Sequence, residues 1–500
     1  MPMRKKFDLQ DYESLTPSLT RGHSRSFEPK NDSTVNRIFP VQSAREAKNQ
    51  DPRVTGAPKS EAAESQTENA QAGGSPQLTL KHGHSLTYFG LFIFTLLVYF
   101  RPYELLPSLH WLSRSALVMA VLTLAVYVPT QLGLENRITA RLREVKLALA
   151  LLLCGLLSVP LALEPNRALQ SWVEFSKVVV IFVVMVNVVR TEKRLRALLG
   201  LVLIASCILS LAGLIDYLQG NLALQGRRIA GLIGGLFSNP NDLALHLVTM
   251  FPISLALFLG SRGPLKKSLY LCSVLLLVAG LVATFSRGGF LGFVFVVAFV
   301  VWKLARRNRV VFGGFALTLV LAAVALAPSA YRGRLATTDD DSAVARTDDL
   351  KRSILVAVAH PVVGVGMDNY ILYSNMNKAT HNAYTQVASE TGLVALLVYV
   401  WFLVSPLKPL RRIEEANRSQ KRRPAAYYLA VGLQASLVGY MVVSFFASVA
   451  YLWYAYYLVA YAICLRRIYA HAVEIPTHAP VKVSLPASPA RVRRLAVEEN

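Results

Sequence analysis

One long polar stretch, residues 346–392, interrupts the hydrophobic part of the chain and reads in part Arg346-Thr-Asp-Asp-Leu, His360-Pro-Val-Val-Gly-Val-Gly-Met-Asp, His381-Asn-Ala-Tyr and Glu390-Thr-Gly. It combines acids, an arginine, two histidines and several glycines. Polar backbone rich in glycine cannot lie bare in lipid, so the stretch belongs outside a bilayer or beside a water-filled cavity. We therefore interpret the rest of the chain as a scaffold that holds this stretch at one face of a membrane.

The composition of the chain is that of a membrane protein. Hydrophobic residues make up 53% of the 500 residues, and the mean hydropathy is +0.40. Many apolar runs are long enough to cross about 30 Å of hydrocarbon. The net charge of +23 does not indicate a nucleic-acid partner, because the excess Lys and Arg lie in short loops between apolar runs. The four cysteines lie inside apolar runs without metal-ligand spacing, which predicts small core residues and no disulfide framework.

This pattern predicts an all-α integral membrane protein with about twelve transmembrane helices. We expect a polytopic membrane domain over 85–466, a disordered cytoplasmic tail over 1–84 and a cytoplasmic tail over 467–500. The first tail is polar, poor in aromatic residues, and begins without the apolar segment of a signal peptide. The expected spans are 85–100, 112–131, 147–163, 169–189, 195–218, 241–260, 268–285, 288–303, 310–328, 382–404, 425–446 and 449–466.

Lys and Arg are divided unevenly between alternate loops. The rich loops lie near 137–146, 190–196, 262–267, 303–309 and 408–423. The positive-inside rule then places both termini in the cytoplasm, and places the large, partly helical loop 329–381 between spans nine and ten outside. A few arginines on the outer side oppose this bias and need a separate explanation: Arg101, Arg167, Arg227, Arg228 and Arg287.

Arg227 and Arg228 precede a glycine-broken apolar segment, 229–237, which is too short to span a bilayer. The segment 229–237 is therefore expected to be re-entrant or interfacial. Asn239-Pro240-Asn241 is expected to cap the next helix. The two arginines either bind an anion or form an interfacial pair whose side chains reach the headgroups.

Arg287 lies in Thr-Phe-Ser-Arg-Gly-Gly between two strongly apolar segments. Arginine near membrane depth is costly unless it is paired or hydrated, and its planar fork of donors suits phosphate oxygens. Gly288 and Gly289 permit close approach of a ligand or another backbone. The alternative is a turn arginine paired with a carboxylate.

His381 opens the helix that follows the polar loop, where a neutral imidazole can accept a proton or orient a hydroxyl. His360 stands before Pro361 and alternating glycines, which indicates a tight bend and favours a structural role. Glu390 is expected to be buried and to orient an arginine or a helix. The run Asp339-Asp-Asp341 has no further ligand at suitable spacing, so neither a metal site nor a cofactor is predicted.

Together these elements resemble the O-antigen ligase and O-antigen polymerase superfamily of bacterial membrane glycosyltransferases. The resemblance covers roughly 85–466, with a ligase-like core over about 228–404. The motifs that carry it are, in chain order, Arg228 before Asn239-Pro-Asn241, Ser286-Arg-Gly-Gly289, Arg346, His360-Pro-x-x-Gly-x-Gly366, and His381-Asn-x-Tyr384 followed by Glu390-x-Gly392.

The resemblance implies an enzyme of the bacterial inner membrane that works on the outer side without a metal ion. Its donor would be an undecaprenyl-diphosphate-linked glycan, and its acceptor a lipid A core sugar or another glycan or protein. We assign the diphosphate to Arg228, Arg287 and Arg346, and the acceptor hydroxyl to His381. The supporting residues are Arg227, Asn239, Asn241, His360 and Glu390.

Two other functions compete with ligation. The first is polymerisation of O-antigen or exopolysaccharide by a member of the same superfamily, which the motifs do not distinguish. The second is transport of lipid-linked sugars. Transporters commonly contain internal repeats, whereas this sequence shows no repeat and gathers its polar residues at one expected face.

Overall fold

The computed structural model of the protein describes residues 83–101, 107–220, 239–304, 313–314, 317–318, 321, 341–374, 378–420 and 424–474. The chain divides into two units, and all the described residues belong to the second, Gln77–Asn500. Several predictions fall on residues outside these ranges. They concern Arg227, Arg228, Asp339, Asp340, most of the span 310–328 and most of both tails.

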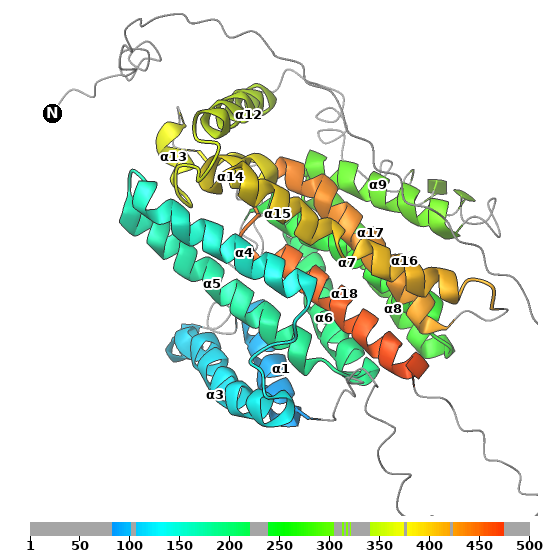
Figure 1. The fold of residues 1–500 in the computed structure, drawn as a ribbon. Helices are drawn as coiled ribbons and strands as arrows, with labels where there is room; N and C mark the ends of the chain where they lie inside the picture. Colours follow the sequence, from blue (N-terminus) through cyan, green and yellow to red (C-terminus); the bar gives the residue numbers. More distant parts are fainter. Residues whose placement is uncertain are drawn as a thin grey trace, which may run out of the picture. The chain divides into compact units, whose positions relative to one another are not determined.

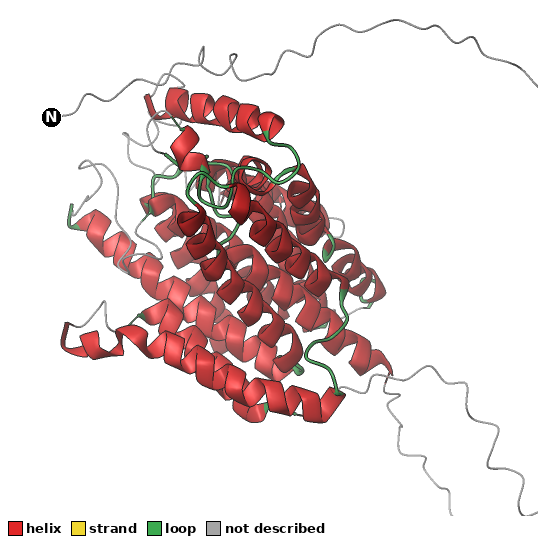
Figure 2. Ribbon diagram, turned by 60° about the vertical axis from the view of Figure 1, so that its left-hand side comes forward, coloured by secondary structure: helices red, strands yellow, loops and turns green. Residues whose placement is uncertain are grey.

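The described secondary structure is helical throughout, without a strand (Figures 1 and 2). The longer helices are α1 (Ser85–Phe100), α3 (Ser115–Glu135), α4 (Arg143–Ser158), α5 (Pro165–Val188), α6 (Glu192–Leu218), α7 (Pro240–Gly260), α8 (Pro264–Ala283), α9 (Arg287–Leu304), α12 (Asp341–Ala359), α15 (Leu393–Val404), α16 (Leu407–Ala416), α17 (Ala425–Val443) and α18 (Trp453–Glu474). Shorter elements are η2 (Pro107–Arg114), η3 (Val159–Leu161), α13 (Tyr370–Tyr373), α14 (Ala383–Thr391) and η4 (Ser444–Phe446).

Nine helices within the described ranges are long and apolar enough to cross a membrane. They are Leu112–Glu135, Arg143–Leu161, Pro165–Val188, Glu192–Leu218, Pro240–Gly260, Pro264–Ala283, Arg287–Leu304, Leu393–Ala416 and Ala425–Phe446. The prediction of an all-α membrane protein is confirmed, whereas the count of twelve spans is not. The helix Ser85–Phe100 is apolar but shorter than these nine.

Two expected spans have different bounds in the structure. The expected span 382–404 is broken at Gly392, whose φ of 92° ends α14, so the membrane-length helix begins only at Leu393. The run 449–466 becomes helical only at Trp453 and continues to Glu474. Its extension past the expected end at 466 is held by Arg466, which donates to the buried carboxylate of Glu144 at 2.9 and 3.1 Å.

Of the nine candidate spans, those that include α7 and α17 are the two most buried. Small residues on α17 let the two backbones approach closely, as is typical of helices in membranes. A Cβ added to Gly432 would lie 2.7 Å from the Pro252 carbonyl oxygen, and the Ser436 hydroxyl donates to Thr249 O at 2.7 Å. These contacts make α7 and α17 the centre on which the other helices pack.

The described loops lie at the two ends of the helices. At one end of the helices, Asn369 Oδ1 accepts from Glu164 N at 2.8 Å, and Arg167 pairs with Asp368 at 2.8 Å. In Figure 1, α12, α13 and α14 lie at this end. At the other end, Arg143 donates to Ser405 O at 3.1 Å. The side of the membrane that each end faces stays a prediction.

Glycines within residues 360–392 permit backbone hydrogen bonds between the loop after α12 and the end of α14. We call this set of hydrogen bonds the backbone lock. Gly366 N donates to Glu390 O at 2.9 Å, and Leu393 N donates to Pro361 O at 2.8 Å. Gly364 and Gly392 have positive φ, and a Cβ on Gly392 would collide with Val362 O. The pattern predicted a tight bend, and the structure shows that this bend fastens α12 and α13 to α14.

The substitution Gly392→Ala should lower the thermal midpoint of the purified protein. A Cβ would meet the Val362 carbonyl at a backbone conformation that L-residues rarely adopt, so the free energy of unfolding should fall by more than about 1 kcal/mol. Gly133→Ala in α3 is the matched control, because nothing lies within 4 Å of its added Cβ. Equal midpoints for the two variants would contradict the proposed lock.

Candidate active site

A cavity of about 320 Å³ lies where the starts of α7 and α9 meet α12 and η4. Four of the predicted site residues line it, namely Asn241, Arg287, Arg346 and His381. They come from four different elements, which are α7, α9, α12 and the segment before α14. The fold therefore brings together residues that are far apart in the sequence.

The Ser-Arg-Gly-Gly motif positions Arg287 as the first residue of α9. The Ser286 hydroxyl accepts from Gly289 N at 3.2 Å and donates to Asn241 Oδ1 at 3.0 Å, so one side chain both caps α9 and joins it to the start of α7. A Cβ on Gly288 would lie 2.8 Å from Cβ of Phe446. The two motifs around Asn241 and Arg287 thus form one structural unit beside the cavity.

The His-Asn-x-Tyr motif positions His381 directly before α14. Asn382 caps this helix by accepting from Tyr384 N at 2.8 Å and Thr385 N at 3.1 Å. The Tyr384 hydroxyl donates to Met441 O at 2.8 Å, which fastens α14 to α17. Asn382 and Tyr384 are therefore structural supports, and His381 is the member of the motif whose imidazole is available at the cavity.

The backbone of His381 has a φ of 51°, in the left-handed region that few side-chain-bearing residues occupy. Phe285, which lines the same cavity, has a φ of 53°. Such residues persist only where the surrounding structure holds them, and they gather at functional sites. Two of them on one cavity support the interpretation of this region as a site.

The imidazole of His381 is held in its neutral form. Burial is the main cause that lowers the pKa of His381, and the positive charge of Arg346 lowers it further. A neutral imidazole at pH 7 can accept a proton from a hydroxyl, as general base catalysis requires. No hydrogen bond among the described residues uses this imidazole, so it is available to a substrate.

Asp349 is a residue near this site that the sequence analysis did not single out. It is buried on α12, three positions after Arg346, and its negative charge partly opposes the effect of Arg346 on the His381 pKa. The Tyr370 hydroxyl donates to the Asp349 carbonyl at 3.0 Å and fixes this turn of α12. The i, i+3 spacing from Arg346 was the available signal, because such residues share a helix face.

Three predicted supporting residues lie away from the cavity lining. Asn239 caps α7 by accepting from Asn241 N at 2.9 Å. The His360 ring packs edge-on against Tyr373 at a centroid distance of 6.0 Å. Glu390 is 4% exposed and belongs to the backbone lock. Of the two roles expected for Glu390, which were to orient an arginine or a helix, a contact with an arginine is not seen among the described residues.

Burial raises the pKa of Glu390 to about 8. The carboxyl lies beside Tyr451 and Gln386, and the nearby Asp368 carboxylate disfavours a second negative charge. The side chain is therefore largely protonated at pH 7. A neutral carboxyl suits a buried packing position at the end of α14.

Residues 272–400 match the family model described as O-antigen ligase. The matched range includes Arg287, Arg346, His381 and Glu390, and it confirms the resemblance drawn from the sequence motifs. It supports a membrane glycosyltransferase of the O-antigen ligase or polymerase type. No match to a curated protein was found.

The substitution Glu390→Gln should flatten the pH dependence of thermal stability. The unfolded carboxyl titrates near 4.5 and the folded one near 8, so the stabilising effect of protonation is complete below about pH 4.5 and is lost as the pH rises through about 8. Between about pH 6 and about pH 9, the wild-type melting midpoint should fall by at least ~2 °C more than that of the variant.

The control for this experiment is Glu164→Gln, which changes an exposed glutamate in the loop before α5. It should keep the pH dependence of the wild-type protein. A wild-type profile that matches the Glu390→Gln profile would show that Glu390 is ionised in the folded protein at neutral pH.

Proposed function

We propose that the ligase-like core transfers a glycan from undecaprenyl diphosphate to an acceptor hydroxyl, with a lipid A core sugar as the acceptor. One observation carries this proposal: Arg287, Arg346 and His381 line a single cavity. Two guanidinium groups suit a diphosphate, and a neutral imidazole suits a hydroxyl. A donor and an acceptor can therefore meet in this cavity.

The rim of the cavity suits a lipid-linked donor. Leu291 and Phe445 line the cavity and are 41% and 52% exposed. Exposed apolar side chains beside cationic ones match a molecule with a charged headgroup and a hydrocarbon chain. We propose that the diphosphate contacts Arg287 and Arg346 while the polyprenyl chain runs along Leu291 and Phe445.

The proposed reaction is a displacement at the anomeric carbon of the donor glycan. The acceptor oxygen forms a bond to this carbon as the bond to the diphosphate oxygen breaks. His381 takes the proton of the acceptor hydroxyl, and the bonding electron pair leaves with undecaprenyl diphosphate. Arg287 and Arg346 stabilise the negative charge that develops on this leaving group, a role that a divalent cation fills in other enzymes. We expect transfer to persist in EDTA.

The proposed location is the bacterial inner membrane, with the cavity on its outer side. Support for this orientation comes from the Lys-rich and Arg-rich loops, which gather at the end of the helices opposite the cavity. Polymerisation of a lipid-linked glycan would use the same chemistry with a different acceptor. The two reactions leave different products on the cell surface.

Deletion of the gene followed by analysis of lipopolysaccharide tests the proposed reaction. A ligase deletion should give lipid A core without attached glycan, together with accumulated lipid-linked polymer. Single glycan repeat units on the core would instead indicate a polymerase. Unchanged surface glycans would overturn both assignments.

Arg287 and His381 should differ in the step that their substitution affects. Arg287→Lys keeps the charge and loses the planar fork, so turnover should fall on the order of 10²-fold or more and donor binding should weaken. His381→Ala should lower turnover on the order of 10² to 10⁴-fold while the donor still binds. Donor binding and single-turnover transfer are measured on purified variants at equal protein amounts.

The matched control is Arg167→Lys, at the same end of the helices but outside the cavity lining. Lysine there can keep the ion pair with Asp368, so transfer should change by less than about twofold. Normal turnover in both Arg287→Lys and His381→Ala would place the active site elsewhere. Loss of donor binding in His381→Ala alone would reverse the assigned roles.

A further inference from the structure

A second and larger cavity, of about 1450 Å³, lies between α6, α7, α8 and the start of α17. Pro424 and Ala425 at the start of α17 line it, whereas Phe445 and Phe446 after the end of α17 line the candidate active site. The 19 residues of α17 make it about 28 Å long. Because this is close to the thickness of membrane hydrocarbon, the two cavities belong to opposite membrane faces.

The cavity is a wedge between α6 and α8. The two helices touch near Ser210 and Gly280, where an added Cβ on Gly280 would lie 2.6 Å from the Ser210 Cβ. Toward their first residues the helices separate, and nothing lies within 4 Å of an added Cβ on Gly200. Ile204 and Leu269 line the wedge and are each 58% exposed. The wedge is therefore open to its surroundings along apolar side chains.

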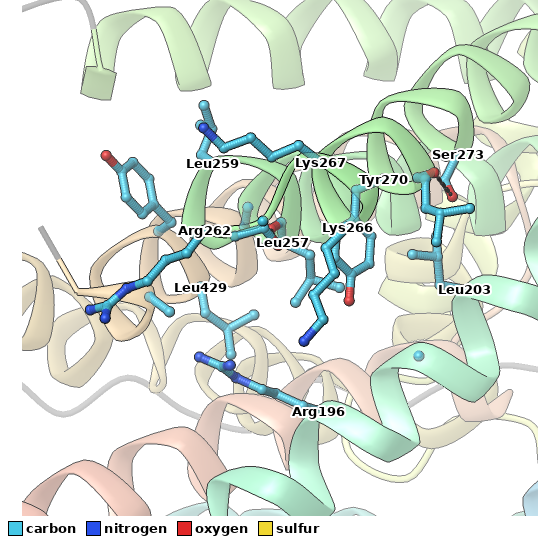
Figure 3. Close-up of a pocket in the computed structure, with 18 of the residues that line it drawn as sticks. Arg196, Leu203, Leu257, Leu259, Arg262, Lys266, Lys267, Tyr270, Ser273 and Leu429 are labelled. Atoms are coloured by element: carbon cyan, nitrogen blue, oxygen red, sulfur yellow. Dashed lines mark hydrogen bonds between the residues drawn. The ribbon is translucent and has the colours of Figure 1, made fainter.

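The mouth of the wedge is strongly basic. Arg196, Arg262, Lys266 and Lys267 line it, and the one acid in its lining, Glu192, is paired with Arg196 at 2.5 Å. Arg262, Lys266 and Lys267 form no ion pair with any residue that the structure describes. Figure 3 shows the side chains of Arg196, Arg262 and Lys266 extending into the cavity from three different elements. Such a cluster of like charges favours an anionic ligand.

The walls behind the cations are apolar. Leu203, Leu257 and Leu429 come from α6, α7 and α17 and line the same cavity (Figure 3). Inorganic phosphate would use the cations and leave the exposed side chains of Ile204 and Leu269 uncovered. An amphipathic anion uses both the basic mouth and the apolar walls. The volume also exceeds the ~300–1,000 Å³ typical of sites for small soluble ligands.

We propose that this wedge binds one anionic phospholipid from the leaflet that faces the Lys-rich and Arg-rich loops. The lipid phosphate contacts Arg262, Lys266 and Arg196, and an acyl chain lies along the exposed Ile204 and Leu269 side chains between α6 and α8. Basic pockets between transmembrane helices at this face are suited to anionic headgroups. The proposal concerns a site distinct from the candidate active site and does not rest on the proposed function.

Lipid binding to the full-length protein in phosphatidylcholine nanodiscs tests the proposal. Phosphatidylglycerol with the same acyl chains is titrated in, and native mass spectrometry counts the molecules retained. The wild-type protein should retain one phosphatidylglycerol in preference to phosphatidylcholine. The double variant Arg262→Gln/Lys266→Gln should bind it about 30-fold more weakly, because each cation near a membrane surface contributes about fivefold.

The matched control is Lys408→Gln/Arg412→Gln on α16, which removes the same charge from exposed positions outside the wedge. It should change the affinity by less than about twofold. Equal losses in both double variants would show a nonspecific surface effect and would overturn the proposal. So would equal retention of phosphatidylglycerol and phosphatidylcholine by the wild-type protein, a comparison that requires no variant.

Glycerol phosphate distinguishes a lipid site from a phosphate site. If the acyl chain occupies the wedge, glycerol phosphate should displace the bound lipid only at concentrations far above those of short-chain phosphatidylglycerol. Displacement by both compounds at similar concentrations would show that only the phosphate is recognised, and the phospholipid proposal would fail.

Discussion

The close contact between α7 and α17 determines where the groups of the candidate site lie. Pro252 inside α7 has no amide hydrogen to donate, and the Ser436 hydroxyl on α17 donates to the nearby Thr249 carbonyl. Gly432 brings the two backbones together at the same level. Because α7 begins at one cavity and ends at the other, this contact positions Asn241 at one end and the wall of the basic wedge at the other.

The polar stretch 346–392 combines two kinds of residue that its sequence does not separate. Gly364, Gly366 and Gly392 shape the backbone so that the loop after α12 can bond to the end of α14. His381 and Arg346 line the cavity that this arrangement encloses. The glycines therefore take no direct part in the proposed reaction. They hold α12 and α14 against each other and so position Arg346 and His381.

Hydropathy and charge predicted much of this architecture, because lipid imposes a simple rule on long apolar helices. Arg287 and His381 could also be singled out as candidates from the sequence, because a polar side chain next to apolar segments is costly unless it has a partner or a function. The break at Gly392 was missed because the mostly polar residues 382–391 and the apolar residues 393–404 were predicted as one span, and composition does not report φ. The basic wedge was missed for another reason. Arg196 and Lys266 belong to the first turns of two separate helices, α6 and α8, and only helix packing brings them to one cavity.

The left-handed backbone at Phe285 and His381 has a consequence for how such a protein changes over time. Each of these residues occupies a conformation that glycine would adopt at lower free energy, so the native side chains are retained at some loss of stability. Selection for heat resistance alone would favour glycine or a relaxed turn at both positions. A thermostable descendant obtained in that way would keep its helices and its lipid-facing surface, yet the imidazole and the first turn of α9 would no longer be held where the cavity needs them.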